Sequence, residues 1–254
     1  MGVGPDQNQP QSGQIRTRMS RFRIFVLFVP VLLGGCQTAA VEPATALAQT
    51  CRFLLTYDDG PSASRDYNPT LDILRQLESN DVQPDIKALF FVQTRNKTGG
   101  GTRLGQAIMR YQHNSGHVLG LHSGTARGHI RHTKMAPEEL TQSLRDGQDD
   151  LRAITGYDTV FIRPTFWGYS DQTRDIYAAH ALKMLLTDVN NRDGLLINSM
   201  FGLRERIRSE FLRVRRAIER GELPQRHGSI PLVVTLHDLN PVTALRMTEY
   251  LHIL

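Results

Sequence analysis

From Cys51 onward the chain alternates short apolar runs with longer amphipathic stretches, and this alternation limits the possible folds more than any other feature. The apolar runs have the length of strands and lie at Arg52–Tyr57, Lys87–Gln93, His117–His122, Val160–Pro164, Lys183–Val189 and Pro231–His237. Helices are predicted at Thr70–Glu78, Leu104–Gln112, Pro137–Ala153, Gln172–Ala181, Met200–Arg220 and Thr243–His252. These units predict an α/β fold with a parallel sheet, either a closed or nearly closed barrel or an open, doubly wound sheet.

Reactive side chains stand at the ends of most of these strands. They are Asp58, Asp59, His122, Arg163, Asp188, His237 and Asp238. In parallel barrels the active-site residues gather where the strands end. The repeated placement therefore favours the barrel and predicts a single polar site on one rim.

Two adjacent carboxylates, Asp58 and Asp59, end the first strand just before Gly60-Pro61. Successive residues leaving a strand point in different directions, so one carboxylate could bind a metal while the other accepts a proton. A simple turn with side-chain hydrogen bonds is the alternative. Histidines 122 and 237 at matching strand ends favour the metal site, and a carboxylate with histidines is typical of zinc or a similar divalent cation.

This arrangement resembles the polysaccharide deacetylases of carbohydrate esterase family 4, the NodB-homology domain. The resemblance extends over Cys51–Leu254 and keeps the order of the family's motifs. The matching segments are Thr56–Pro61, Phe161–Pro164, Leu186–Asp188 and Thr235–Asp238. The resemblance implies a distorted (β/α) barrel of the polysaccharide deacetylase type.

The resemblance also implies a role for each matched residue. Asp58 would be the general base, Asp59 a metal ligand, Arg163 the residue that orients the base, Asp188 the partner of the catalytic histidine, His237 the general acid and Leu236 part of the acetyl pocket.

The histidine motif departs from the family pattern. The family usually places a second histidine four residues after the first, but Ala126 stands four residues after His122. His129 and His132 are the candidates. In the family the second histidine is typically followed by five residues that end in a lysine, and then by a helix start. By this resemblance, counting back from Lys134 and Pro137 favours His129, with a three-residue insertion within Gly124–Gly128. A two-ligand or inactive site is the remaining alternative.

The arginine motif departs as well, because Arg163-Pro is followed by Thr165, Phe166 and Trp167. Phe166 and Trp167 are candidate substrate-binding residues. Trp167 could stack on a sugar ring at the rim or pack in the core.

The function that the resemblance implies is hydrolysis of a carbon–nitrogen bond other than a peptide bond. A divalent metal, with zinc favoured and cobalt or another ion possible, would assist removal of N-acetyl groups from an amino-sugar polysaccharide such as peptidoglycan, chitin or poly-N-acetylglucosamine. An O-acetyl esterase and a catalytically degenerate glycan-binding barrel are the alternatives.

The first 50 residues are predicted to be an export signal and a tether. Basic residues precede ten apolar ones, which end in Leu33-Gly-Gly-Cys36, a sequence that resembles the bacterial lipobox. We therefore expect a signal peptide at residues 1–35, lipidation of Cys36, a flexible tether over residues 36–50 and a catalytic domain at residues 51–254. Gln37, directly after the cysteine, favours an anchor in the outer membrane with the protein facing the periplasm. Met19 is an alternative to Met1 as the first residue of the protein.

The net charge of +5 is mostly carried by the leader. Removing residues 1–35 takes four arginines and one aspartate from 30 basic and 25 acidic residues, which leaves 26 and 24. This balance argues against a nucleic-acid partner, and the arginine-rich stretch from Arg204 to Arg220 is predicted to be a solvated helix face. The expected partners are a polysaccharide substrate and, through the lipid, a membrane.

Overall fold

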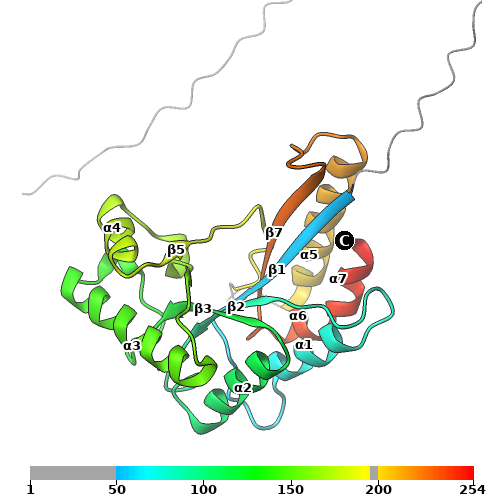
Figure 1. The fold of residues 1–254 in the computed structure, drawn as a ribbon. Coiled ribbons are helices and arrows are strands. Elements are labelled where there is room, and N and C mark those ends of the chain that lie inside the picture. The colour runs from blue at the N-terminus through cyan, green and yellow to red at the C-terminus, as the bar shows by residue number, and fades with distance from the viewer. Residues whose placement is uncertain (1–49, 195–199) are drawn as a thin grey trace, which may run out of the picture. The chain divides into compact units, whose positions relative to one another are not determined.

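The computed structural model describes residues 50–194 and 200–254. In this part of the chain seven parallel strands form one sheet in the order β5-β4-β3-β2-β1-β7-β6 (Figure 1). The strands are β1 (Thr50–Asp58), β2 (Leu89–Gln93), β3 (Val118–Ser123), β4 (Phe161–Ile162), β5 (Lys183–Met184), β6 (Val189–Asn190) and β7 (Ser229–His237). The predicted signal peptide, Cys36 and nearly all of the tether lie outside the described residues; Thr50 begins β1.

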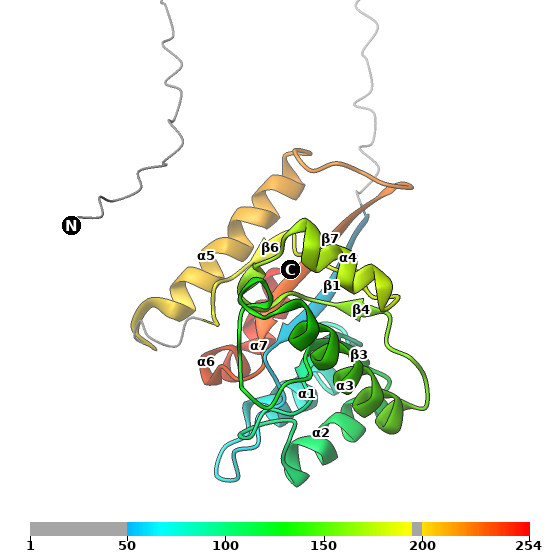
Figure 2. The same cartoon turned by 90° about the vertical axis from the view of Figure 1, so that its left-hand side faces the viewer.

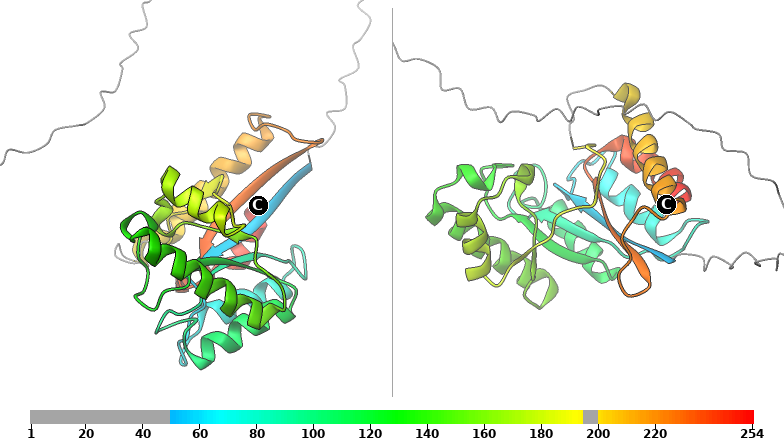
Figure 3. Two further views of the ribbon diagram at one scale, coloured as in Figure 1. Left: turned by 60° about the vertical axis from the view of Figure 1, so that its left-hand side comes forward. Right: turned by 90° about the horizontal axis from the view of Figure 1, so that it is seen from above.

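Helices lie around the outside of the curved sheet (Figure 3). They are α1 (Pro69–Glu78), α2 (Arg103–Asn114), α3 (Pro137–Thr155), α4 (Asp171–Ala179), α5 (Met200–Glu219), α6 (Pro241–Leu245) and α7 (Met247–Ile253). Several begin at a side chain that accepts a hydrogen bond from the first turn, as Asn68, Thr102 and Ser170 do. Among the described helices, none combines the length and the apolar content that crossing a membrane requires.

The sheet curls because four residues join its two edges. The chain passes from Met184, in β5, to Val189, in β6, and these strands lie at opposite edges of the sheet. Five residue steps reach at most about 18 Å, whereas a flat sheet of this width would measure about 29 Å. The structure therefore confirms the predicted distorted (β/α) barrel, in the form of a half-barrel.

The two faces of β1 lie in different environments, one apolar and one polar. Leu55 and Tyr57 are buried in the hydrophobic core, where Tyr57 stacks on Phe90 with ring centroids 4.9 Å apart. Thr56 and Asp58 alternate with them and belong to a polar cluster inside the half-barrel. β1 pairs with β7 over its whole length, so Asp58 lies beside His237.

Two predicted elements differ from the structure. The predicted strand Lys183–Val189 is two short strands separated by the segment that crosses the sheet, and the predicted helix Thr243–His252 is split into α6 and α7. The first difference changes which acidic residue reaches the site.

Candidate active site

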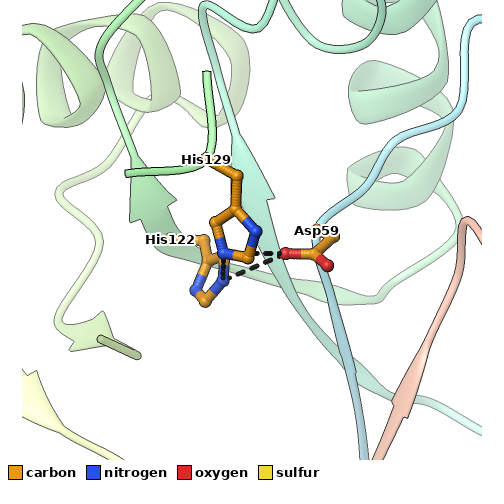
Figure 4. Close-up of side chains that lie close together, drawn as sticks. All are labelled: Asp59, His122 and His129. Atoms are coloured by element: carbon orange, nitrogen blue, oxygen red, sulfur yellow. Dashed lines mark hydrogen bonds and ion pairs between the residues drawn. The ribbon is translucent and has the colours of Figure 1, made fainter. Parts of the chain in front are cut away.

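Three side chains converge on one point at the rim. The Oδ1 atom of Asp59, the Nε2 atom of His122 and the Nε2 atom of His129 form a triangle with sides of 3.2 Å (Figure 4). Ligand atoms 2.0–2.1 Å from a tetrahedral zinc ion lie about 3.3–3.4 Å from one another. The donor set and its spacing therefore fit a divalent metal such as zinc.

The end of β1 separates the two adjacent carboxylates. Asp58 is the last residue of the strand, and Asp59 follows in the left-handed region with φ 76°. The next residue must be a glycine, because a Cβ on Gly60 would lie 2.0 Å from Oδ2 of the buried Asp238. Burial alone would raise the pKa of Asp59, but the hydrogen bond with His122 and the nearby histidines lower it, so this carboxylate is ionised.

His122 is held in the tautomer that a metal ligand needs. It lies at the end of β3 and is buried, and its Nδ1–H donates to the backbone carbonyl of Arg163 at 2.9 Å. The lone pair on Nε2 is therefore directed to the triangle.

His129 reaches the triangle from the loop after β3, in which Gly128 adopts φ 93°. Its ring stacks on Phe166 with centroids 4.2 Å apart. Burial lowers the pKa of His129 to about 4, so the ring is neutral at pH 7, as a ligand must be.

The alternative ligand His132 lies elsewhere. It is buried, and its Nδ1 is hydrogen-bonded to the hydroxyl of Tyr177 at 2.6 Å. Burial lowers its pKa to about 3. The structure thus brings His129, and not His132, to Asp59 and His122.

Asp58 is fixed by a buried arginine. Arg163 is 0 % exposed and donates to Oδ1 of Asp58 at 2.8 Å and to Oγ1 of Thr56 at 2.7 Å. The same guanidinium donates to the carbonyls of Leu185 and Leu186, at 3.0 and 3.1 Å, in the segment that crosses the sheet. Arg163 therefore orients the carboxylate and links β1 to the segment between β5 and β6.

His237 has an acidic partner, but it is Asp193 and not the predicted Asp188. The ring Nδ1–H of His237 donates to Oδ1 of Asp193 at 2.7 Å, and its backbone N–H donates to Oδ2 at 2.9 Å. Asp188 is exposed and accepts from the backbone N–H of Val233 at 2.8 Å. Because Asp188 precedes β6, it lies beside a residue four positions before His237, about 13 Å along β7.

The buried carboxylate of Asp193 keeps His237 protonated. Burial alone would lower the pKa of His237, but the charge and hydrogen bond of Asp193, with further contributions from Asp58 and Asp59, raise it to about 10. At pH 7 the ring is an imidazolium that can donate a proton from Nε2. The sequence pattern assigns no role to Asp193. The one feature that could have indicated a role is its position shortly after the last apolar residue of β6.

Leu236 does not line the site. It faces away from His237 because adjacent strand residues point to opposite sides, and it is fully buried in the core. The prediction that it forms the acetyl pocket is therefore corrected.

Phe166 and Trp167 do reach the site. Both adopt positive φ, 54° and 57°, in a tight turn after β4. The guanidinium of Arg163 lies 5.2 Å from the Trp167 ring. These two residues line a cleft of about 420 Å³ together with Asp58, Asp59, His122, His129, Arg131, Pro164, Asn190, Arg192, Gly194 and His237.

The half-barrel and its polar rim define a class of protein, the (β/α)-barrel enzymes of carbohydrate esterase family 4. A family model described as polysaccharide deacetylase matches residues 49–185, and the chain belongs to this family. Membership confirms the predicted family and its enzyme class, a hydrolase.

Solved structures share the fold. A family 4 carbohydrate esterase from Streptomyces lividans, in complex with acetate, is 20% identical, with a TM-score of 0.61 over 81% of this chain and 88% of that one. The chitin deacetylase of Colletotrichum lindemuthianum is 20% identical, with a TM-score of 0.62 over 81% and 83%.

One curated protein is similar in sequence. The peptidoglycan-N-acetylmuramic acid deacetylase PdaC of Bacillus subtilis (strain 168) is 27% identical over 145 residues, which are 55% of this chain and 26% of that protein. The chain thus spans about a quarter of the length of this relative.

Proposed function

We propose that the protein is a metal-dependent hydrolase that removes N-acetyl groups from an amino-sugar polysaccharide and releases acetate. One observation carries the proposal: the Asp59–His122–His129 triangle lines the same cleft as an arginine-held carboxylate and an aspartate-held imidazolium. Membership of the polysaccharide deacetylase family supports the same conclusion.

Asp59, His122 and His129 would hold a divalent cation, and their nitrogen and oxygen donors favour zinc. When bound, such a cation supplies a Lewis acid that polarises the acetyl carbonyl and lowers the pKa of a water molecule.

Asp58 is placed to act as the general base. Arg163 occupies one oxygen of its carboxylate and fixes its orientation, so the carboxylate can take the proton of an attacking water without reorganising. Arg163 is a positioning residue, because it is fully buried behind Asp58.

His237 is placed to act as the general acid. An amine is a poor leaving group unless it is protonated, and the Nε2–H of an imidazolium can supply the proton. The hydrogen bond from Nδ1–H to Asp193 fixes the ring and stabilises its positive charge.

The cleft accommodates a sugar between aromatic and polar walls. The exposed ring of Phe166 and the half-buried Trp167 offer apolar faces for a sugar ring. The similar proteins are named for chitin and for peptidoglycan, so chitin-like chains, peptidoglycan and poly-N-acetylglucosamine are the candidate substrates.

Acetate release tests the proposal. The purified protein, supplied with zinc or cobalt, should release acetate from at least one of these N-acetylated glycans, and a chelator should abolish the release. A parallel assay with an O-acetylated xylan separates amide from ester hydrolysis. Glycan binding without acetate release, and with no bound metal, would instead support a degenerate binding barrel.

We also propose that the chain is exported and anchored by a lipid on Cys36, with the tether leading to the catalytic domain at residue 51. Action on peptidoglycan, the polymer for which the similar protein is named, would require export. Mass spectrometry of the mature N-terminus and fractionation of wild type and Cys36→Ser test the anchor: the variant should lose the lipid and leave the membrane fraction.

A further inference from the structure

A second hollow borders the catalytic cleft. A groove of about 450 Å³ lies between α5 and the residues that follow β6, which are adjacent in the fold (Figure 2). Asn190 and Arg192 line both the cleft and the groove. The groove is completed by Asn191, Arg206, Ser209, Glu210, Arg213 and Arg216. The groove therefore adjoins the catalytic cleft at these two shared residues.

The groove carries a net positive charge, because four arginines and one acid line it. Its one acid, Glu210, is bound by Arg213 at 2.9 Å. In the part of the chain that the structure describes, no carboxylate lies within 4.0 Å of Arg192, Arg206 or Arg216. Residues 195–199 contribute no carboxylate, because their sequence is Leu-Leu-Ile-Asn-Ser.

The other arginines of α5 and its end behave differently. Arg204 and Arg208 face Glu249, Arg215 pairs with Glu219, and Arg220 pairs with Glu222. These pairs are what a solvated helix face should show. Arg206 and Arg216, the arginines of α5 without such a partner among the described residues, both line the groove, so the unpaired charge of the helix lies beside the cleft.

Arg192 is held in position by its neighbours. It is exposed and adopts φ 53°, between the buried residues Asn191 and Asp193. Its backbone N–H donates to Oδ1 of Asn190 at 2.9 Å, and the side chain of Asn191 donates to the carbonyl of Thr235 at 3.1 Å. A non-glycine residue persists in this conformation where its surroundings fix it, which happens often at binding sites.

We propose that this groove binds carboxylates of an acidic N-acetylated glycan, so that the substrate is anionic and not a neutral polymer. Arg192 contacts the glycan beside the reacting sugar, and Arg206 and Arg216 contact it further along α5, over about 15 Å. A guanidinium binds a carboxylate through two parallel hydrogen bonds, which makes arginine well suited to this role. The inference rests on the proposed deacetylase function and specifies its substrate class.

A pair of probes that differ only in charge tests the inference. One is an oligosaccharide of alternating N-acetylglucosamine and N-acetylmuramic acid with free carboxylates; the other is the same oligosaccharide with those carboxylates amidated. We expect the acidic probe to have the higher kcat/KM for acetate release and the lower Kd by calorimetry. Raising the salt concentration from about 0.05 M to about 0.5 M should reduce this preference, because exposed charges are screened.

Matched variants locate the effect. Arg206→Gln/Arg216→Gln should lower the preference for the acidic probe by about two- to thirtyfold, from the usual worth of exposed charge pairs. Arg215→Gln/Arg220→Gln removes the same charge from paired arginines outside the groove and should keep the preference.

The outcomes separate the two proposals. Acetate release at equal kcat/KM from both probes, with no effect of salt, overturns the acidic-substrate inference and leaves the deacetylase function standing. Tighter binding of the acidic probe that the groove variant abolishes, without acetate from either probe, supports the groove and contradicts the deacetylase function. Equal loss of preference in both double variants shows a general charge effect and overturns the inference.

Discussion

Asp193 binds His237 through both of its carboxylate oxygens, one accepting from the ring Nδ1–H at 2.7 Å and the other from the backbone N–H at 2.9 Å. The same carboxylate accepts from Oγ1 of Thr243 at 2.6 Å, and the backbone carbonyl of Asp193 accepts from Asn240. The loop after β6 and the start of α6 are thus joined at the proposed acid.

Replacing Asp193 should disable this acid. We expect Asp193→Asn to lower kcat by about 10²- to 10⁴-fold, the usual worth of a general acid. Removing the negative charge lowers the pKa of His237 from about 10, so the loss of activity at alkaline pH should begin at a lower pH. Steady-state kinetics across pH measures both effects. Asp188→Asn is the control and should retain activity; an equal loss in that variant contradicts the assignment.

The two candidate histidines should differ in metal binding. His129→Ala removes one corner of the triangle and should lose the metal, as measured by calorimetry with zinc and by metal analysis. His132→Ala should keep the metal but lose stability, because the hydroxyl of Tyr177 loses its partner, at a cost of about 1–3 kcal/mol. The reverse pattern would overturn the ligand assignment.

The buried Arg163–Asp58 pair should be costly to break. Arg163→Met leaves Asp58 buried without its charged partner and should lower the free energy of unfolding by about 3–5 kcal/mol. The double variant Arg163→Met/Asp58→Asn should recover part of that stability, since no unpaired charge remains, but should stay inactive. Urea unfolding with activity assays measures this. No recovery in the double variant would show that the crossing segment, which Arg163 also binds, carries most of the cost.

His117 should make stability depend on pH. It is buried, and its Nδ1 accepts from the backbone N–H of Ala88 at 3.1 Å. Burial, with the charge of Lys87, lowers its pKa from 6.5 to about 4. Between pH 4 and pH 6.5 the unfolded chain therefore binds more protons at this residue, and its contribution to stability rises with pH and is lost on acidification.

His117→Asn keeps an acceptor that does not titrate in this range. Chemical unfolding of wild type and variant between pH 4 and 7 should show a shallower loss of stability for the variant on acidification. Parallel curves for the two proteins would contradict a buried, neutral His117.

The positions of four strands along the chain and the polar rim could be predicted because both depend on local sequence. Apolar runs of strand length mark β1, β2, β3 and β7, and a side chain at the carboxyl end of a parallel strand reaches the rim. This placed Asp58, Asp59, His122 and His237 near one another before the register was known. The register of β1 on β7 then sets Asp58 beside His237.

What could not be predicted depends on how the chain crosses the sheet. The apolar run Lys183–Val189 has the pattern of one strand, but its two ends pair at opposite edges of the sheet. Asp188 therefore comes just before β6, and Asp193 follows it. No local pattern shows where such a segment crosses. Leu236 was misplaced for a simpler reason, because the alternation of β7 places it on the face opposite His237.

The pairing of β1 with β7 has a consequence for when the sheet can fold. The first strand of the sheet has the last strand as its neighbour, with Thr50 beside Ser229 and Asp58 beside His237. One edge of β1 must remain without its partner until almost the entire chain has been synthesised, and contacts between such distant residues form slowly. For the export proposed above, in which the chain would cross a membrane in an extended state, this delay would be an advantage, because the topology postpones folding until the C-terminal region is available.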